Sequence, residues 1–289
     1  MNELFISSEI ELLDERLGGG FRKRGAYLFA AEKKAGKSSF VRKIIFNLLA
    51  VGKKVLLIDT EESEEDILAV MASIAKEKDT DALTEEDLED TREVMKNMPL
   101  VDCNRFIGEF YVEGALSLDV LEAYIKRQKD FGVEVVVFDN VTREGAENSA
   151  NARMKLMTQL IKLSKKYELL LFVVGHTPSS EVDLLDRQVI TRVIETRQFD
   201  ELLSTTQRFV QRPKDPYGGS ATSQFDGVFI IWRPFQYYKQ EELRKISYLI
   251  VEQIRTSAPF TLSMDYDGAK KLFSFIKPLV IEGGLWKEV

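Results

Sequence analysis

The segment AEKKAGKS at positions 31–38 restricts the fold of this chain more than any other feature of the sequence. An apolar run that ends at Ala31 precedes the segment, and an amphipathic run that begins at Lys37 follows it. A strand, a tight loop and a helix are therefore expected in that order. The segment matches the phosphate-binding pattern G-x-x-x-x-G-K-S/T at every defined position except the first, where alanine replaces glycine. A chance G-K-S at a helix start is the alternative, and the flanking strand and helix argue against it.

The residue types in this loop suit the binding of a nucleotide. Gly36 lets the backbone turn tightly, so that its N–H groups point at the β-phosphate. Lys37 brings a compact positive charge to the β- and γ-phosphates, and the Ser38 hydroxyl is a magnesium ligand. The other residues that we expect to line the nucleotide are Ala31, Glu32, Lys33, Lys34, Ala35 and Ser39. The sequence thus predicts that the chain binds ATP and Mg²⁺.

Short apolar runs alternate with amphipathic runs along the chain, which predicts an α/β fold with a mainly parallel sheet between helices. The expected strands are Tyr27–Ala31, Lys54–Asp59, Glu134–Asp139, Glu168–Gly175 and Gly227–Arg233. The expected helices are Lys37–Val51, Ser63–Lys76, Leu118–Phe131 and Ala152–Tyr167. After Arg233, three runs predict an antiparallel C-terminal extension of the sheet, at Ile246–Ile254, Phe260–Met264 and Lys271–Phe275.

No linker divides the sequence, so we expect an N-terminal segment at 1–24 and one ATPase domain at 25–289. Residues 179–224 are predicted to be an insertion, with a helix near Val189–Arg208 and a loop at Asp215–Gly219. Long insertions in such sheets are often functional.

Acidic residues follow two of the expected strands at the edge where parallel sheets bind ligands. VVVFD at 135–139 ends in Asp139, the expected magnesium ligand, directly or through water. VLLIDTEE at 55–62 ends in three acids, of which Glu61 is the expected general base, with Asp59 and Glu62 as competitors. The alternative interpretations are a cap after the first strand and a solvated helix start after the second.

His176, the one histidine of the chain, ends the strand that follows Asp139. A single histidine is usually structural, but at this strand end it could detect the γ-phosphate and couple hydrolysis to the next loop.

Composition limits the other possibilities. The single cysteine, Cys103, excludes an internal disulfide, which favours the cytoplasm (the host cytoplasm for a phage protein). Its side chain is expected to pack in an apolar strand. No apolar run is long enough to cross a bilayer, so no membrane partner is expected. The net charge is −7, but positions 59–93 hold 15 acidic and 3 basic residues, so the remainder is mildly basic and compatible with an anionic ligand.

Together these residues resemble the helicase domain of the DnaB/RecA-like superfamily, most closely the helicase half of phage primase–helicases and mitochondrial Twinkle. The resemblance extends from Leu13 to Gly268. It rests most on Gly36–Arg42, Gly52–Val55, Glu61–Glu65 and the run Met154–Lys166 leading into Leu171–His176.

The resemblance implies a RecA-like P-loop NTPase core and an ATP-dependent replicative DNA helicase. It implies a ring-shaped homo-oligomer, usually a hexamer, that passes single-stranded DNA through its centre, with a separate primase or helicase loader as a further candidate partner. Glu61 would be the catalytic glutamate and His176 the phosphate sensor. Arg233 would lie against the nucleotide base, with Tyr266 stacked on its other side. Arg255 would be the arginine finger offered to the neighbouring subunit, although a surface arginine on an edge strand is the alternative.

The sequence departs from the family pattern in three places. Gln253 replaces a lysine two residues before the expected finger, and Thr-Pro-Ser-Ser-Glu after His176 replaces a lysine-bearing DNA loop. We also expect no primase domain before residue 25 and a missing or shortened linker helix. The candidate DNA contacts are basic residues at Arg143, Arg153, Arg187, Arg192, Arg197, Arg208, Arg212 and Lys214, which a solvated surface would explain nearly as well.

Three functions fit the sequence. The first is a helicase that moves on single-stranded DNA. The second is a RecA- or KaiC-like ATPase that assembles on DNA or protein without unwinding. The third is a module in which bound ATP only holds an assembly together.

Overall fold

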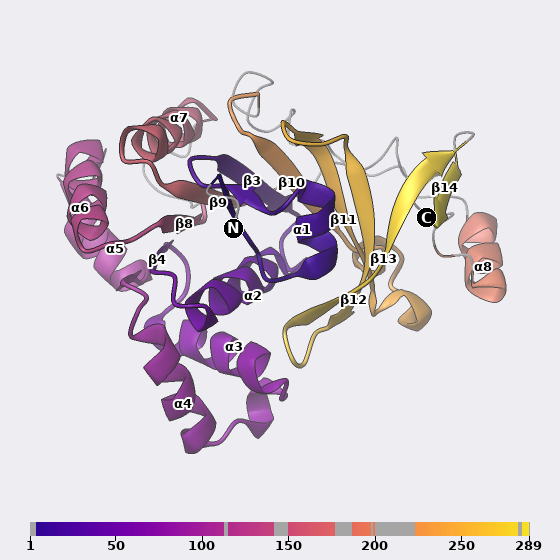
Figure 1. Cartoon of the computed structure of the whole chain (residues 1–289). Helices are drawn as coiled ribbons and strands as arrows, with labels where there is room; N and C mark the ends of the chain where they lie inside the picture. Colours follow the sequence, from indigo (N-terminus) through magenta and orange to yellow (C-terminus); the bar gives the residue numbers. More distant parts are fainter. Residues whose placement is uncertain are drawn as a thin grey trace.

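A ten-stranded sheet forms the centre of the computed structural model, which describes residues 4–112, 115–141, 150–176, 187–197, 199, 223–282 and 285–288. Within these residues the strand order is β14-β13-β12-β11-β10-β3-β9-β8-β4-β5 (Figure 1). The parallel strands are β3 (Ala26–Ala31), β4 (Val55–Asp59), β5 (Leu100–Val101), β8 (Val135–Asp139), β9 (Leu170–His176) and β10 (Gly227–Trp232). The antiparallel strands are β11 (Ile246–Ile254), β12 (Phe260–Asp267), β13 (Leu272–Glu282) and β14 (Leu285–Glu288). The predicted fold class is confirmed.

Helices cover both faces of the parallel strands, which explains why these strands are continuously apolar. Every residue of β3 is buried, and its alternate residues belong to two different clusters: Tyr27 and Phe29 to one, Leu28 and Ala30 to the other. The first cluster includes residues of α1 (Glu11–Leu17), α2 (Lys37–Ala50) and α3 (Glu64–Lys76), and part of α4 (Glu85–Met95) packs against it. The second cluster includes residues of α5 (Cys103–Phe110), α6 (Leu118–Asp130) and α7 (Ala150–Lys166).

Smaller elements complete the described structure. The strand pairs are β1 (Phe5–Ile6) with β2 (Phe21–Arg22), and β6 (Tyr111–Val112) with β7 (Ala115–Leu116). The short α12 (Phe235–Tyr238) follows β10, and 3₁₀ turns lie at Thr80–Ala82 and Glu241–Leu243. α8 (Arg187–Thr196) packs through the buried Val193 against Trp232 and Tyr248 of the sheet.

Two sequence-based expectations were wrong. The helix expected near Val189–Arg208 begins at Arg187 and ends at Thr196, because Arg197 adopts a left-handed conformation with φ of 53° that a helix cannot continue. Residues 198 and 200–208 of that expectation lie outside the described residues. Cys103 is the first residue of α5 and is only half-buried, because the Asp102 side chain accepts a hydrogen bond from the Arg105 N–H and starts a helix there.

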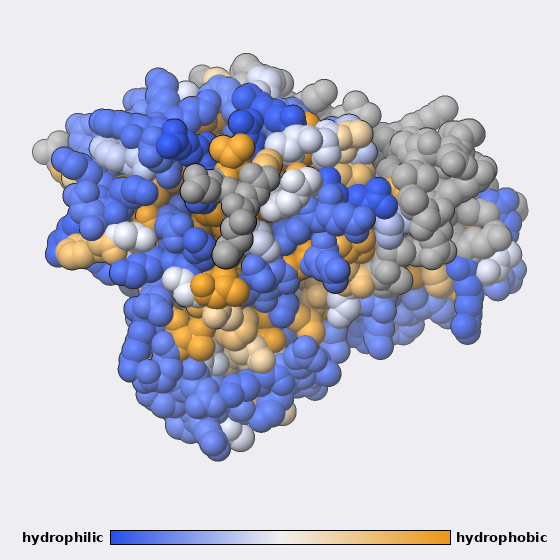
Figure 2. All heavy atoms as spheres, in the orientation of Figure 1, coloured by the Kyte–Doolittle hydropathy of each residue, from blue (hydrophilic) through white to orange (hydrophobic). Residues whose placement is uncertain are grey.

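Most of the acidic residues at positions 59–93 lie on the outer surface of α3 and α4, whereas Asp59 is buried at the end of β4. Thr84 and Asp87 cap α4 reciprocally, and the remaining acids of its first turn, Glu85 and Glu86, are exposed. Figure 2 shows hydrophilic residues along the lower rim of the molecule, where Figure 1 places α4. This charge is therefore a solvated surface of one layer. Among the described helices, none has the length and apolar character that a membrane span requires.

Candidate nucleotide site

The loop between β3 and α2 turns sharply at two residues. Lys34 has φ of 66° and Gly36 φ of 89°, and α2 begins at Lys37 without a side-chain cap. A Cβ at Gly36 would also lie 2.9 Å from the ring of Phe273, so position 36 requires glycine for both conformation and space. Ala31 remains in β3, paired with His176 of β9, and is not among the residues with positive φ. This explains why alanine suffices at the first position of the motif.

Interactions with the segment after β10 hold the outside of this loop. The Gln236 side-chain amide donates to the carbonyl of Lys33 at 2.8 Å, and Arg233 Nη1 lies 3.5 Å from the carbonyl of Lys34. Lys37 is 6% exposed, Ser39 and Ala35 are buried, and Glu32 and Ser38 are half-buried. The loop that leads into α2 is thus held in place by these side chains. Its backbone N–H groups and those at the start of α2 are therefore positioned to bind phosphate.

The ends of β4 and β8 are held side by side. Asp59 pairs in register with Asp139, and both are almost fully buried. Beyond the strands, the Asn140 N–H donates to Thr60 Oγ1 at 3.2 Å, while Thr60 Oγ1 donates to the Asn140 carbonyl at 3.1 Å. Burial and the nearby Asp139 raise the pKa of Asp59 to about 6, against the opposing effect of Arg42.

Arg42 distinguishes the three acids after β4. Its Nη2 donates to Asp59 at 2.8 Å and its Nη1 to Glu62 at 2.7 Å, and the arginine side chain is only 2% exposed. No role was predicted for Arg42 from the sequence, although a charged residue on the otherwise apolar face of α2 was a signal for one. With Asp59 and Glu62 bound to Arg42, Glu61 is the acid of the three that faces His176.

Glu61, His176, Asn140 and Lys37 come together from the ends of four elements. Glu61 Oε1 lies 3.9 Å from His176 Nε2, and Asn140 Nδ2 lies 3.3 Å from the same nitrogen. The neighbouring His176, followed by Asn140 and Lys37, lowers the pKa of Glu61 to about 2, against the opposing effect of partial burial. Glu61 is therefore an ionised carboxylate at neutral pH beside the phosphate-binding lysine.

The donors at this edge fit a magnesium ion that is shared with phosphates. Among the described residues, no three His, Cys, Asp or Glu side chains form a complete metal cluster. Mg²⁺ in phosphate sites uses one or two protein ligands and completes its shell with phosphate oxygens and water. Ser38 at the start of α2 and Asp139 at the end of β8 supply such ligands, and a cation here would also favour the charged form of Asp59.

Arg233 and Tyr266 do meet, but not with space for a base between them. The Arg233 guanidinium lies on the Tyr266 ring, with Cζ 4.1 Å from the ring centroid. Arg233 Nη2 also donates to the Arg244 carbonyl at 3.0 Å, and Tyr266 contacts Phe273 at a centroid distance of 4.4 Å. A base stacked between Arg233 and Tyr266 would have to separate them.

Arg255 lies at the opposite edge of the sheet from Lys37. It follows β11, is half exposed and lies 3.5 Å from Asp226, which precedes β10. Arg255 and Lys37 of one chain are therefore separated by the length of the strands. Gln253 donates to the Phe225 carbonyl at 3.0 Å, a contact within its own chain.

The candidate DNA contacts are only partly described. Arg153 is half-buried in α7, and Arg192 and Arg197 are exposed in and after α8. Arg187 begins α8. The positions Arg143, Arg208, Arg212 and Lys214 lie outside the described residues.

Comparison with known proteins identifies the family. Residues 6–191 match the model of the family described as "ATPase: KaiC", which covers more than half of the chain. The chain belongs to the KaiC family of ATPases. It is therefore a P-loop ATPase with a RecA-like fold. No curated protein matches the chain.

Solved structures show the same fold. The ATPase domain of another protein is 17% identical with a TM-score of 0.69, over 96% of this chain and 94% of that one. A DnaB-like replicative helicase, solved for its interactions with primase, is 18% identical with a TM-score of 0.69, over 94% of this chain and 62% of that one. The KaiC-like protein PH0186 from Pyrococcus horikoshii OT3 is 16% identical with a TM-score of 0.59, over 94% of this chain and 98% of that one. The resemblance to DnaB/RecA-like helicase domains is thus confirmed for the fold.

Proposed function

We propose that this ATPase is a DNA helicase motor that hydrolyses ATP to move along single-stranded DNA as a ring-shaped homo-oligomer. The observation that carries the proposal is the meeting of Lys37, Glu61, Asn140 and His176 at the edge where β3, β4, β8 and β9 end. Such a site holds a triphosphate, a water molecule and a sensor of the terminal phosphate within reach of one another.

In this proposal each side chain has a separate task. Lys37 and the N–H groups of residues 32–39 hold the phosphates, and the ionised Glu61 orients the attacking water and accepts its proton. His176 contacts the γ-phosphate and ends β9, so its position would respond to hydrolysis. Arg42 keeps Asp59 and Glu62 away from this water by binding both.

Ser38 and Asp139 would hold Mg²⁺, which neutralises phosphate charge when it is bound. Arg233 and Tyr266 would contact the base. One of them would have to turn aside for a base to stack between the two, and an alternative is that the base lies on the outer side of the pair.

Arg255 would complete the site of a neighbouring subunit. It lies at the far edge of its own sheet, so a contact with its own γ-phosphate is not possible without a large rearrangement. A head-to-tail arrangement places this edge of one subunit against the nucleotide edge of the next, and such contacts form a ring when they close. DNA would contact the basic residues after β8 and in the 179–224 segment, and a primase or loader would be a further partner.

A second candidate is an ATPase that assembles on DNA or protein without separating strands. The match of residues 6–191 to the KaiC family supports it. Both candidates require ATP hydrolysis at Lys37, and they differ in whether turnover is linked to strand separation.

Hydrolysis of ATP with and without single-stranded DNA tests the proposal, using Lys37→Ala and Arg255→Ala as variants. The helicase motor predicts strong stimulation by DNA that both variants lose, followed by strand displacement on a forked duplex. A rate of ATP hydrolysis that changes neither with DNA nor in Arg255→Ala would contradict the helicase proposal. The chain would then be an ATPase with another partner. DNA-stimulated turnover without displacement would favour the second candidate.

A further inference from the structure

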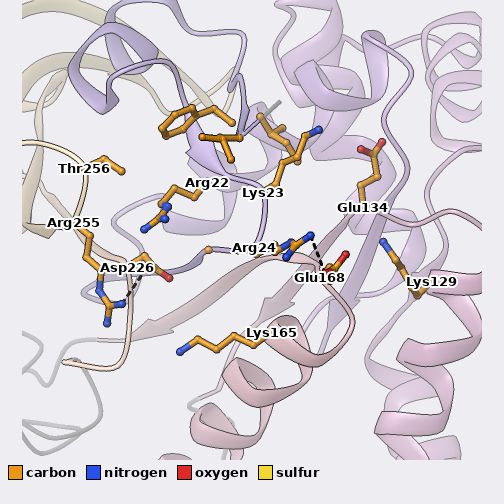
Figure 3. A pocket seen from close by; sticks show the side chains of 14 residues that line it. Arg22, Lys23, Arg24, Lys129, Glu134, Lys165, Glu168, Asp226, Arg255 and Thr256 are labelled. Carbon is orange, nitrogen blue, oxygen red and sulfur yellow. Dashed lines mark ion pairs between the residues drawn. The ribbon is translucent and has the colours of Figure 1, made fainter. Parts of the chain in front are cut away.

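A second cluster of positive charge lies at the edge of the sheet where the parallel strands begin. It lines a cavity of about 1020 Å³ (Figure 3). Its cationic lining residues are Arg22, Lys23, Arg24, Lys129, Lys165 and Arg255. Lys37 follows β3, whereas Arg22–Arg24 precede it, so the six residues of this strand separate the cavity from the nucleotide site by about 20 Å.

Three of these cations are consecutive on one fixed turn. The Gly25 N–H donates to the Arg22 carbonyl at 2.8 Å, which closes the turn before β3. The Arg22 N–H donates to the Tyr27 hydroxyl at 2.9 Å, and the Lys23 N–H donates to the Leu4 carbonyl at 3.0 Å. The backbone that carries Arg22, Lys23 and Arg24 is thus held at three points and needs no ligand to order it.

All three acids that line the cavity already have cationic partners. Arg24 binds Glu168 at 2.8 Å, and Arg255 lies 3.5 Å from Asp226. Lys53, outside the cavity, binds Glu134 at 3.0 Å.

The other four cations have no such partner among the described residues. Arg22, Lys23, Lys129 and Lys165 form no side-chain hydrogen bond or ion pair within the part of the chain that the structure describes. They come from the β2–β3 turn and from the ends of α6 and α7, and Figure 3 shows them around the same hollow. The cavity therefore carries an excess of positive charge that its own acids do not neutralise.

We propose that this cavity binds a compact anion with several phosphate groups, either an inorganic oligophosphate or the phosphate chain of a free nucleotide. A phosphate chain places several negative charges within a short length, which matches four unneutralised cations around one hollow. A cavity of this volume has the size of a small-ligand site, whereas nucleic-acid backbones are usually followed by an extended groove. The ligand would be distinct from the ATP that is bound at Lys37 of the same chain. Because Arg255 lines the cavity, the cavity would face the neighbouring subunit in the proposed ring.

Binding of tripolyphosphate by calorimetry in low salt tests this site. The protein carries Lys37→Ala, so that the nucleotide loop contributes little. Lys129→Glu with Lys165→Glu reverses two charges of the cavity. Lys126→Glu with Lys162→Glu is the matched control, because these lysines are exposed on the same two helices and do not line the cavity.

We expect the affinity for tripolyphosphate to fall at least about tenfold in the cavity variant and to change by less than about twofold in the control. Circular dichroism and thermal unfolding check that both variants are folded.

Titration with ATP in the same variants separates the two sources. If the cavity variant loses as much affinity for ATP as for tripolyphosphate, relative to the control variant, the cavity accepts a free nucleotide. Equal affinities of the cavity and control variants for tripolyphosphate would overturn the proposal. A loss of affinity in the cavity variant that is seen only for a single-stranded oligonucleotide would overturn the proposal too, and would assign the cavity to nucleic acid. Either failure leaves hydrolysis at Lys37 untouched, which is measured separately with Lys37 restored.

Discussion

At the scale of single residues, Arg42 is the buried charge on which the acidic end of β4 depends. It is 2% exposed and binds the equally buried Asp59 as well as Glu62. Replacing Arg42 by methionine leaves Asp59 buried without its cation, so the free energy of unfolding should fall by about 3–5 kcal/mol in urea titrations. Arg92→Met, which removes two exposed ion pairs of α4, should cost much less. Equal losses in the two variants would mean that Arg42 does not stabilise Asp59.

Glu61 is the residue whose removal should separate nucleotide binding from hydrolysis. It is half exposed beside His176, and it is not needed to hold the loop that precedes α2. Glu61→Gln keeps the size of the side chain but removes the acceptor for the proton of water, so turnover should fall by about 100-fold or more. The affinity for ATP, measured with a fluorescent analogue, should remain within about threefold of the parent. Glu64→Gln, on the exposed start of α3, should leave both unchanged, whereas full turnover in Glu61→Gln would transfer the role to another acid.

At the scale of elements, the phosphate-binding loop packs against the antiparallel extension of the sheet. Gly36 and Gly52 both have positive φ, but a Cβ at Gly36 would meet Phe273 of β13, whereas a Cβ at Gly52 would meet nothing within 4 Å. Gly52→Ala should therefore cost only about 1 kcal/mol of backbone strain, and Gly36→Ala more than that.

A double-mutant cycle with Phe273→Ala isolates the contact. The double variant should lose less stability in urea than the two single losses combined, because removing the ring makes room for the methyl group. Additive losses would show that the loop and β13 are independent.

The elements that could be predicted from the sequence are those with a strong periodic pattern. β3, β4, β8 and β9 and the helices α2, α3 and α7 begin and end within two residues of their expected positions. α4 was missed because its acids leave little apolar periodicity, although Thr84 and Asp87 signal its start. The direct stacking of Arg233 on Tyr266 could not be predicted, because it brings the residue after β10 onto β12 through a register that only the folded sheet sets. For the same reason the cavity, with residues from positions 4 to 256, has no motif in the sequence.

At the scale of the whole molecule, Lys37 and Arg255 lie at opposite edges of one sheet. If the proposed head-to-tail assembly is correct, each hydrolysis site combines Lys37 of one subunit with Arg255 of the next. Two inactive variants, Lys37→Ala and Arg255→Ala, should then restore activity when they are mixed after dissociation and reassembly.

Random assembly of equal amounts gives about one intact interface in four, so turnover should recover to roughly a quarter of the parent value. Mixing Lys37→Ala with Glu61→Gln is the matched control. Both of those residues belong to the same subunit's half of the site, so an intact interface needs Lys37 and Glu61 on one chain, and neither variant has both. Recovery in the first mixture but not in the second would therefore place Arg255 in the neighbour's site, whereas no recovery in either would return Arg255 to the role of a surface arginine that pairs with Asp226.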